Sequence, residues 1–257
     1  MAFKHIALEV RGPVGWYRFN RPPVNAVHWD MLREMSAAFE ELMARDDVRV
    51  VVIASALERY FNAGADIAAF GEALEGGMAD WINLTHGLAR RVRAADKPVL
   101  AAINGIAVGG GLEMSLHADL RFAADNARLG QPEINIAFIP PVAGTQALVR
   151  LVGRSHAFRI LYGGELMDAA EALRIGLVDF VNPADRLEDE VQAYGEMLAG
   201  KPANALAAIR RCLIDAADET FENGMSIERV EAESLAEHSN FAEGVSAFQA
   251  KRKPTWR

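Results

Sequence analysis

The sequence of 257 residues is poor in cysteine and in side chains placed at metal-binding spacings. Its one cysteine, Cys212, cannot form an internal disulfide and lies in a helix-like run, where we expect a small buried apolar role. None of the six histidines has a second ligand at metal-binding spacing or a nucleophile partner. We therefore expect no metal site and no serine nucleophile, and we assign the histidines no catalytic role.

Long apolar runs and a secretory leader are also missing. No apolar stretch approaches the length that spans a bilayer, and charge interrupts the first apolar residues too early for a secretory signal. The expected location is the cytoplasm. Hydrophobic residues make up 51% of the chain and charged residues 24%, which is typical of a globular protein with a sizeable core.

Acidic residues outnumber basic ones by 35 to 27, which gives a net charge of −8. This balance argues against broad attraction to nucleic acid or to an anionic membrane. One basic cluster, Arg90, Arg91, Arg93 and Lys97, falls on a predicted helix and leaves RNA binding open as an alternative. A solvated helix face is the favoured interpretation of that cluster, so we expect no nucleic-acid partner and no membrane partner.

Hydrophobic patterns predict an α/β fold. Residues 6–19 have the pattern of a short hairpin, and residues 48–54 and 98–103 are apolar runs typical of strands covered on both faces. Helical spacing predicts helices at residues 30–45 and 80–95. Strand, loop and helix in repetition indicate right-handed crossovers and a mostly parallel sheet.

The pattern changes after about residue 190 of the chain. Residues 203–217 and 227–239 have helical spacing, and Asn223-Gly224 predicts a turn between them. We therefore divide the chain into an α/β core at residues 1–190, which holds the candidate site, and a helical unit at residues 191–257.

Two glutamates are candidates for acid–base chemistry. Glu113 and Glu133 are twenty positions apart (133 − 113 = 20), and they end the glycine-containing runs 109–113 and 130–133. Two carboxyl groups in one cleft can divide proton donation and proton removal between them when their surroundings separate their pKa values. A lone glutamate near a helix start is more often a solvated partner of the helix dipole, so the hypothesis depends on the pair.

Two strand-to-helix junctions provide candidate oxyanion donors. Residues 62–66 follow the strand at 48–54, and the glycines at 109–111 follow the strand at 98–103. The first N–H groups of a helix lack partners and lie at the positive end of its dipole, so both junctions can donate to a developing negative oxygen. Alone, three consecutive glycines more often mark a tight turn or close packing.

Three linked motifs in this order resemble the crotonase superfamily, and among its members an enoyl-CoA hydratase. They are Tyr-Phe-Asn-Ala-Gly-Ala-Asp-Ile at 60–67, Ala-Ile-Asn-Gly-Ile-Ala-Val-Gly-Gly-Gly-Leu-Glu at 102–113 and Leu-Gly-Gln-Pro-Glu at 129–133. The resemblance covers nearly the whole chain, from residue 20 to residue 254. It implies a ββα-spiral core, a C-terminal helical unit that serves as a trimerisation domain or lid, and a homotrimer or dimer of trimers.

The resemblance also implies a reaction. The substrate is an acyl-CoA thioester, whose thioester oxygen takes up enolate charge held by the backbone N–H groups of Ala65 and Gly110. Glu113 and Glu133 match the family's catalytic carboxylates, which hold a water between them and add it across the α,β double bond. No metal or redox cofactor is implied, because stabilising the enolate lowers the barrier and the carboxylates handle the protons. Coenzyme A is part of the substrate.

Further site residues follow from the same resemblance. The candidates for substrate and coenzyme A binding are Ala63, Gly64, Asp66, Ile67, Lys251 and Lys253. The candidate walls of an acyl pocket are Phe70, Leu74, Trp81, Leu84, Met114, Phe138 and Pro141. Residues 22–25 lack the basic residue that some relatives use near the coenzyme phosphates. The two lysines could replace it from a neighbouring subunit, or they could form only a solvated tail.

One departure from the family pattern bears on the reaction. Residues 139–146 read Ile-Pro-Pro-Val-Ala-Gly-Thr-Gln, so Pro141 stands where hydratases of this type have a glycine whose N–H holds the catalytic water. A neutral hydrogen bond is worth roughly 0.5–1.5 kcal/mol, so hydration need not fail. The alternatives are a Δ3,Δ2-enoyl-CoA isomerase, which needs one carboxylate, and a hydrolase or decarboxylase acting on acyl-CoA.

Overall fold

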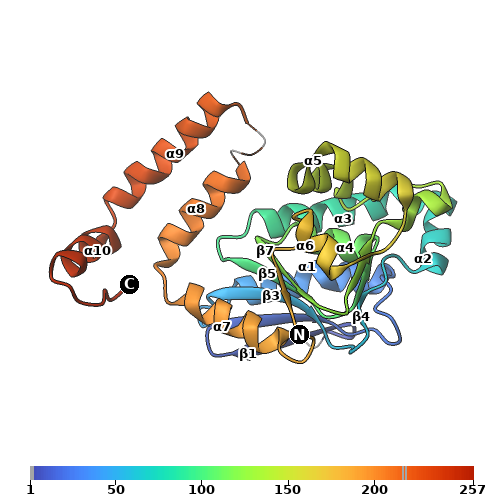
Figure 1. Cartoon of the computed structure of the whole chain (residues 1–257), viewed down its shortest axis with the longest axis horizontal. Helices are drawn as coiled ribbons and strands as arrows, with labels where there is room; N and C mark the ends of the chain where they lie inside the picture. Colours follow the sequence, from blue (N-terminus) through green and yellow to red (C-terminus); the bar gives the residue numbers. More distant parts are fainter. Residues whose placement is uncertain (1–2, 216, 218) are drawn as a thin grey trace.

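The computed structural model describes residues 3–215, 217 and 219–257, and it confirms the predicted α/β architecture followed by C-terminal helices (Figure 1). The strands are β1 Ile6–Arg11, β2 Val14–Phe19, β3 Val50–Ser55, β4 Tyr60–Asn62, β5 Val99–Ile103, β6 Ile106–Val108, β7 Leu120–Ala124, β8 Arg128–Gly130, β9 Met167–Asp168 and β10 Phe180–Asn182. The α-helices are α1 Trp29–Met43, α2 Ile67–Glu72, α3 Met78–Arg93, α4 Gly110–Leu116, α5 Gly144–Gly163, α6 Ala169–Arg174, α7 Leu187–Ala199, α8 Ala203–Asp215, α9 Phe221–Ala236 and α10 Ser239–Gln249. A π-helical turn, η1, spans Ala73–Gly77, and a 3₁₀ turn, η2, spans Pro132–Ile136.

The larger sheet has the strand order β1-β2-β3-β5-β7-β10. Strand β1 runs antiparallel to β2, and every other neighbouring pair is parallel. All residues of β3 and β5 are buried, as their unbroken apolar runs predict. Helix α1 packs against β1 and β2, while α7 packs against β2, β3, β5 and β7. The hairpin and the parallel strands therefore confirm predictions made from periodicity.

A second sheet, with the order β4-β6-β8-β9, is absent from the sequence-based predictions. Its strands have only two or three residues, too few for an apolar period to be recognised. Strands β4, β6 and β8 are parallel neighbours, and β9 is antiparallel to β8. One expectation is therefore corrected: the two candidate junctions directly follow the short strands β4 and β6, and not the long strands of the larger sheet.

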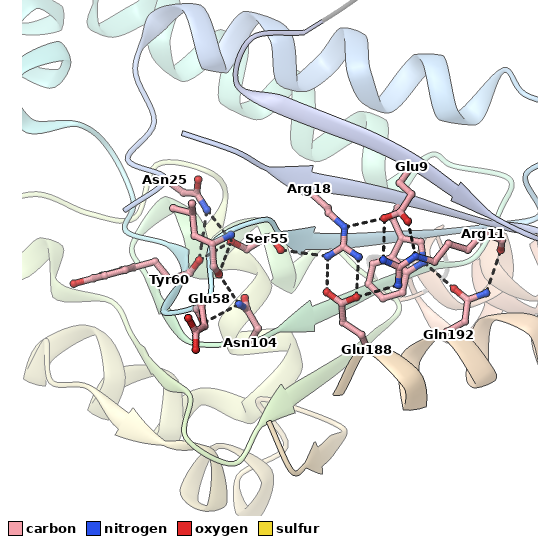
Figure 2. Close-up of polar contacts among 12 residues, drawn as sticks. Glu9, Arg11, Arg18, Asn25, Ser55, Glu58, Tyr60, Asn104, Glu188 and Gln192 are labelled. Carbon is pink, nitrogen blue, oxygen red and sulfur yellow. Dashed lines mark hydrogen bonds and ion pairs between the residues drawn. The ribbon is translucent and has the colours of Figure 1, made fainter. Parts of the chain in front are cut away.

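Two polar clusters fasten the larger sheet to its surroundings (Figure 2). The Arg18 guanidinium on β2 lies between Glu9 of β1 and Glu188 of α7, at 3.4 Å and 2.6 Å from their carboxylate oxygens. In the second cluster, buried Asn25 donates to the Ser55 hydroxyl at 2.8 Å. This bond holds the loop before α1 against β3, beside the candidate site.

Helices α9 and α10 extend away from the α/β body (Figure 1). Helix α8 stays attached to the body, because buried Arg210 bonds to Asp119 and to the carbonyl oxygens of Val92 and Ala95. All of α9 is described, and none of its residues is buried. The turn expected at Asn223-Gly224 is wrong, because both residues lie inside α9. The Thr220 hydroxyl accepts a hydrogen bond from the Asn223 N–H and so starts the helix before that pair. In the described part of the chain, no helix is both long and apolar enough to cross a membrane.

Two members of the basic cluster on and after α3 have structural partners. Arg91 forms an ion pair with Glu40 of α1. The Lys97 amine donates to the carbonyl oxygens of Met43 and Arg45, each at 2.7 Å. These contacts connect the end of α3 to the end of α1, so both basic side chains have a structural role.

Candidate active site

Three parallel strands of the small sheet are each followed by a predicted site residue. Strand β4 leads to Ala65, β6 leads to Gly110, and β8 leads to Glu133. Because parallel neighbours run in the same direction, their carboxyl ends and the loops that follow share one edge of the sheet. The topology therefore brings together segments that are far apart in the sequence.

The junctions after β4 and β6 are in contact. Gly64 has a φ of +80°, and a Cβ atom added there would lie 3.0 Å from the Val108 carbonyl oxygen and 3.5 Å from the Gly110 nitrogen. The Asn62 side chain accepts a hydrogen bond from the Gly64 N–H at 2.8 Å. Glycine tolerates both this φ and so close an approach, so position 64 lets the two candidate oxyanion donors lie near each other.

The N–H groups of Ala65 and Gly110 are available as donors. Ala65 forms a parallel bridge with Val27, in which the Val27 N–H donates to Gly64 and the Asp66 N–H donates to Val27. That pattern directs the Ala65 N–H away from Val27. Gly110 is the first residue of α4, so its N–H has no acceptor within the helix. Neither amide has a hydrogen-bond partner in the part of the chain that the structure describes.

An apolar cavity of about 250 Å³ lies beside these donors. The predicted site residues that line it are Ala63, Gly64, Ala65, Ile67, Phe70, Trp81, Gly110, Met114, Glu133, Phe138 and Pro141. The lining runs from exposed Ile67 to buried Leu32 and Leu88, so the cavity reaches from the surface into the core. Of the other candidate walls, Leu84 lies outside the lining, and the side chain of Leu74 lies outside the described residues.

Glu113, on α4, is fully buried, and backbone donors fix one of its carboxylate oxygens. Oε1 accepts hydrogen bonds from the N–H groups of Val142 and Gly144, each at 2.7 Å. Position 144 leaves no room for a side chain, since an added Cβ would lie 2.5 Å from that oxygen. Glu113 itself does not line the cavity. Its Oε2 has no hydrogen-bond partner among the described residues and lies 4.0 Å from where a Cβ at Gly110, a lining residue, would be, so Oε2 is the oxygen left for proton transfer.

Glu133, in the first turn of η2, is buried and lines the cavity. With its amide nitrogen turned toward Glu133, the buried Gln131 side chain donates to both carboxylate oxygens, at 3.1 and 3.2 Å. Gly109 makes room for the same carboxylate, because an added Cβ would lie 2.8 Å from Oε1. The carboxylate is thus held between Gln131 and the glycine run at the start of α4.

Burial raises the pKa of both carboxyl groups. The pKa of Glu133 rises to about 7 because its carboxylate is removed from water. Burial also raises the pKa of Glu113 well above its ordinary value, and the nearby charge of Glu133 raises it further, while the two backbone donors oppose the rise. Because the charge of Glu133 opposes ionisation of Glu113, the pair can hold one proton near neutral pH. One group can then accept a proton while the other donates.

Some residues predicted to bind coenzyme A lie apart from the cavity lining. Asp66 caps α2 and forms an ion pair with Arg21 at 2.9 Å. Lys251 and Lys253 follow α10, at the end of the helical extension, and neither lines the cavity. The structure therefore gathers the residues near the proposed reacting atoms, while the proposed phosphate contacts lie elsewhere on the same chain.

Two residues that support the carboxylates, Gln131 directly and His117 through the Val142 peptide, escape the sequence analysis. Gln131 lies within a recognised motif, but nothing in its position along the chain predicts contact with Glu133. His117 follows α4 and donates from Nε2 to the Val142 carbonyl oxygen at 2.7 Å. Its spacing of four residues from Glu113 (117 − 113 = 4) is the available signal, since residues four apart share one helix face.

Known proteins share both the sequence pattern and the fold. The sequence model of the family described as "Enoyl-CoA hydratase/isomerase" matches residues 9–257. A "Probable enoyl-CoA hydratase" of Rhizobium meliloti is 35% identical over 260 residues, which cover 100% of this chain and 99% of the relative. The "Crotonyl-CoA hydratase" of Syntrophomonas wolfei is 34% identical over 98% of each chain.

Solved structures give the same result. The crystal structure of an enoyl-CoA hydratase from Bacillus anthracis has a TM-score of 0.94 at 31% identity and covers 98% of this chain and 99% of that one. An enoyl-CoA hydratase from Polaromonas has a TM-score of 0.92 at 27% identity, with 98% and 99% covered. A shared fold alone would not show a family, but here the sequence is also similar over nearly the whole chain. The chain belongs to the enoyl-CoA hydratase/isomerase family and has the crotonase fold.

Proposed function

We propose that this chain is an enoyl-CoA hydratase that adds water across the 2,3 double bond of a 2-enoyl-CoA. The observation that carries the proposal is that two unpartnered backbone N–H groups and the buried carboxyl of Glu133 meet at one apolar cavity. The second buried carboxyl, that of Glu113, lies behind Gly110, with Oε2 4.0 Å from where a Cβ at residue 110 would be. Each part meets a separate need of hydration: the amides stabilise the oxyanion, the carboxyls move protons, and the cavity holds the acyl chain.

The N–H groups of Ala65 and Gly110 bind the thioester oxygen and stabilise the enolate charge that develops on it. Each donor of such an oxyanion hole lowers the barrier by about 3 kcal/mol. Ala63, Gly64 and Ile67, which line the cavity next to Ala65, contact the thioester end of coenzyme A. Their small or apolar side chains leave the backbone within reach of the substrate.

The carboxyl pair begins the reaction with one proton. The ionised carboxyl removes a proton from water as the water oxygen bonds to Cβ, and the electron pair of the double bond moves through Cα to the thioester oxygen. The protonated carboxyl then delivers its proton to Cα as the enolate collapses. The pair of Glu113 and Glu133 ends with one proton again, so this route needs no metal or redox cofactor.

Pro141 favours a second candidate, Δ3,Δ2-enoyl-CoA isomerisation. This residue lines the cavity and has no N–H with which to hold a water. Isomerisation moves a proton between Cα and Cγ without water, and one carboxyl is enough for that transfer. The second buried carboxyl has a use only where water is added, so hydration is the favoured function.

We infer that residues 191–257 form a trimerisation or lid unit and that the chain assembles as a homotrimer or a dimer of trimers. Large apolar side chains on α9 and α10, among them Phe221 and Phe248, are exposed and favour burial against another copy. Lys251 and Lys253 are exposed at the end of this unit. In such an assembly they would reach the coenzyme phosphates of a neighbouring chain.

Crotonyl-CoA provides the test of hydration. We expect loss of the conjugated thioester absorbance with 3-hydroxybutyryl-CoA as the product, and a decrease in turnover of about 10²–10⁴-fold in Glu113→Gln. Glu237→Gln, which changes an exposed glutamate at the end of α9, is the matched control and should leave turnover unchanged. If the absorbance of crotonyl-CoA stays constant while a 3-enoyl-CoA is converted, the function is isomerisation and the hydratase proposal is wrong.

A further inference from the structure

His117 and Glu113 both form hydrogen bonds with one short segment, residues 140–144, which joins the cavity wall to α5. Glu113 lies in α4 and His117 is its C-cap, one helical turn later. The His117 ring is buried, and its Nε2 lies 2.7 Å from the Val142 carbonyl oxygen. Since a carbonyl oxygen can only accept, Nε2 carries the hydrogen and Nδ1 is the bare nitrogen.

Both backbone polar groups of Val142 are used by α4. Its N–H donates to Oε1 of Glu113 and its carbonyl accepts from His117, while Gly144 supplies the second donor to Oε1. Between these contacts Ala143 has a φ of +61°, a left-handed conformation that is disfavoured for residues with a Cβ. Helix α5 also begins here without a side-chain cap. Local preferences oppose the shape of this segment, so tertiary contacts must hold it.

The second ring nitrogen of His117 indicates that packing alone does not explain the residue. Nδ1 is buried and has no partner in the part of the chain that the structure describes. A buried polar atom without a partner costs stability, and an apolar side chain of similar size would avoid that cost. The hydrogen bond from Nε2 to Val142 is the contact that offsets it.

We propose that His117 is a positioning residue of the active site. It holds the Val142 peptide so that the Val142 and Gly144 N–H groups stay on Oε1 of Glu113 and leave Oε2 free for proton transfer. This role rests on the proposed function, in which Glu113 is one of the two carboxyls that handle protons. His117 itself neither contacts the substrate nor moves a proton.

His117 remains neutral in this role. Burial lowers the pKa of its imidazole to about 4; the hydrogen bond to Val142 opposes that change, and the electrostatic effects of Arg93 and His86 on α3 add to it. On the other side of the segment, the charge that faces Glu113 is that of Glu133. The ring is therefore a fixed N–H donor throughout the neutral pH range.

The test compares two side chains of similar size at position 117. His117→Gln keeps an N–H donor, and His117→Met has none. We expect the Met variant to lower kcat for crotonyl-CoA by about tenfold or more with KM changed less than about twofold, because a buried carbonyl loses its partner. The acidic limb of its kcat/KM profile should move to higher pH, since loosened N–H donors no longer favour the ionised carboxyl. The Gln variant should stay within about threefold of the wild type.

His156→Met, on α5 and outside residues 140–144, is the control that leaves both readouts unchanged. Equal kcat values and equal pH profiles for the Met and Gln variants would overturn the proposal, even if both proteins melted at lower temperature. If the wild type converts only a 3-enoyl-CoA, hydration fails as the function, and the same pair of variants tests His117 on that reaction.

Nitrogen NMR of histidine-labelled wild-type protein adds a readout that does not depend on activity. We expect one imidazole in the Nε2–H tautomer that does not titrate between about pH 5 and pH 8. The His117→Gln spectrum identifies this signal by its loss. A His117 signal that titrates near its ordinary pKa, or that carries its hydrogen on Nδ1, would overturn the inference.

Discussion

Glu113 and Glu133 are the part of the candidate site that residue types along the sequence can predict. Their glycine-rich surroundings predict a pair of carboxyls, and the structure places them at two junctions of one small sheet. Their partners are beyond the reach of the sequence. Gln131 and the N–H groups of Val142 and Gly144 meet the carboxylates only through tertiary contacts, and no spacing rule encodes those contacts.

The raised pKa of Glu133 makes the site a source of instability at high pH. The pKa is about 7 in the folded chain against an ordinary value of 4.5. Between these values the native state binds more protons than the unfolded state, so the free energy of unfolding falls as pH rises. Above about pH 7 the full cost of the buried charge approaches about 3 kcal/mol.

Glu133→Gln removes that charge, and we expect the variant to be more stable than the wild type above about pH 7 but much less active. The variant should unfold at a higher urea concentration than the wild type at about pH 8 and at a similar concentration at about pH 4. Its turnover should fall by about 10²–10⁴-fold. Urea titrations of both proteins at several pH values check this. Stability curves that run parallel over the whole range would contradict the raised pKa.

At the scale of elements, strand length decides what the sequence predicts. Strands β3 and β5 have six and five residues, all buried, and their apolar runs are recognisable. Strands β4, β6 and β8 have three residues each and leave no such pattern. The sheet that carries the candidate site is therefore invisible to periodicity, and only the resemblance of the three linked motifs leads to it.

Helices α1 and α3 close the inner end of the cavity with Leu32, Met35 and Leu88. An apolar cavity of roughly 150 Å³ can hold a benzene ring, so a four-carbon acyl group would leave much of this cavity of about 250 Å³ empty. Each further buried methylene contributes about 0.8 kcal/mol. We therefore expect kcat/KM to rise from crotonyl-CoA to a 2-octenoyl-CoA, as measured by initial rates across a chain-length series.

Leu88→Trp fills the inner end of the cavity and tests this expectation on one element. Activity on 2-octenoyl-CoA should fall by about tenfold or more, while activity on crotonyl-CoA stays within about threefold. Leu88→Met is the volume-conserving control and should leave the chain-length profile unchanged. An equal loss on both substrates would mean that residue 88 does not limit chain length.

At the scale of the whole molecule, the helical extension exposes more apolar surface than a lone chain favours. Phe221 is 80% exposed and Phe248 is 86% exposed. The helical character of this region is predictable from spacing, but its direction away from the α/β body is not, because no spacing along the sequence encodes that direction.

We expect light scattering to give the mass of three or six chains. Phe248→Glu should lower that mass while circular dichroism stays unchanged, because a buried charge at the interface opposes association. Tyr162→Glu, which changes an exposed aromatic residue on α5 outside the helical unit, is the control and should leave the mass unchanged. A single-chain mass for the wild type would contradict the proposed assembly.

The most direct measurement follows the atoms of water through the reaction. A 2-enoyl-CoA is incubated with the protein in water labelled with heavy oxygen and deuterium, and the product is analysed by mass spectrometry and NMR. Hydration by the Glu113 and Glu133 pair places heavy oxygen on Cβ and deuterium on Cα with the thioester intact, and Glu113→Gln yields almost no labelled product. Deuterium on Cγ without added oxygen, or heavy oxygen in a released acid beside free coenzyme A, would contradict that chemistry.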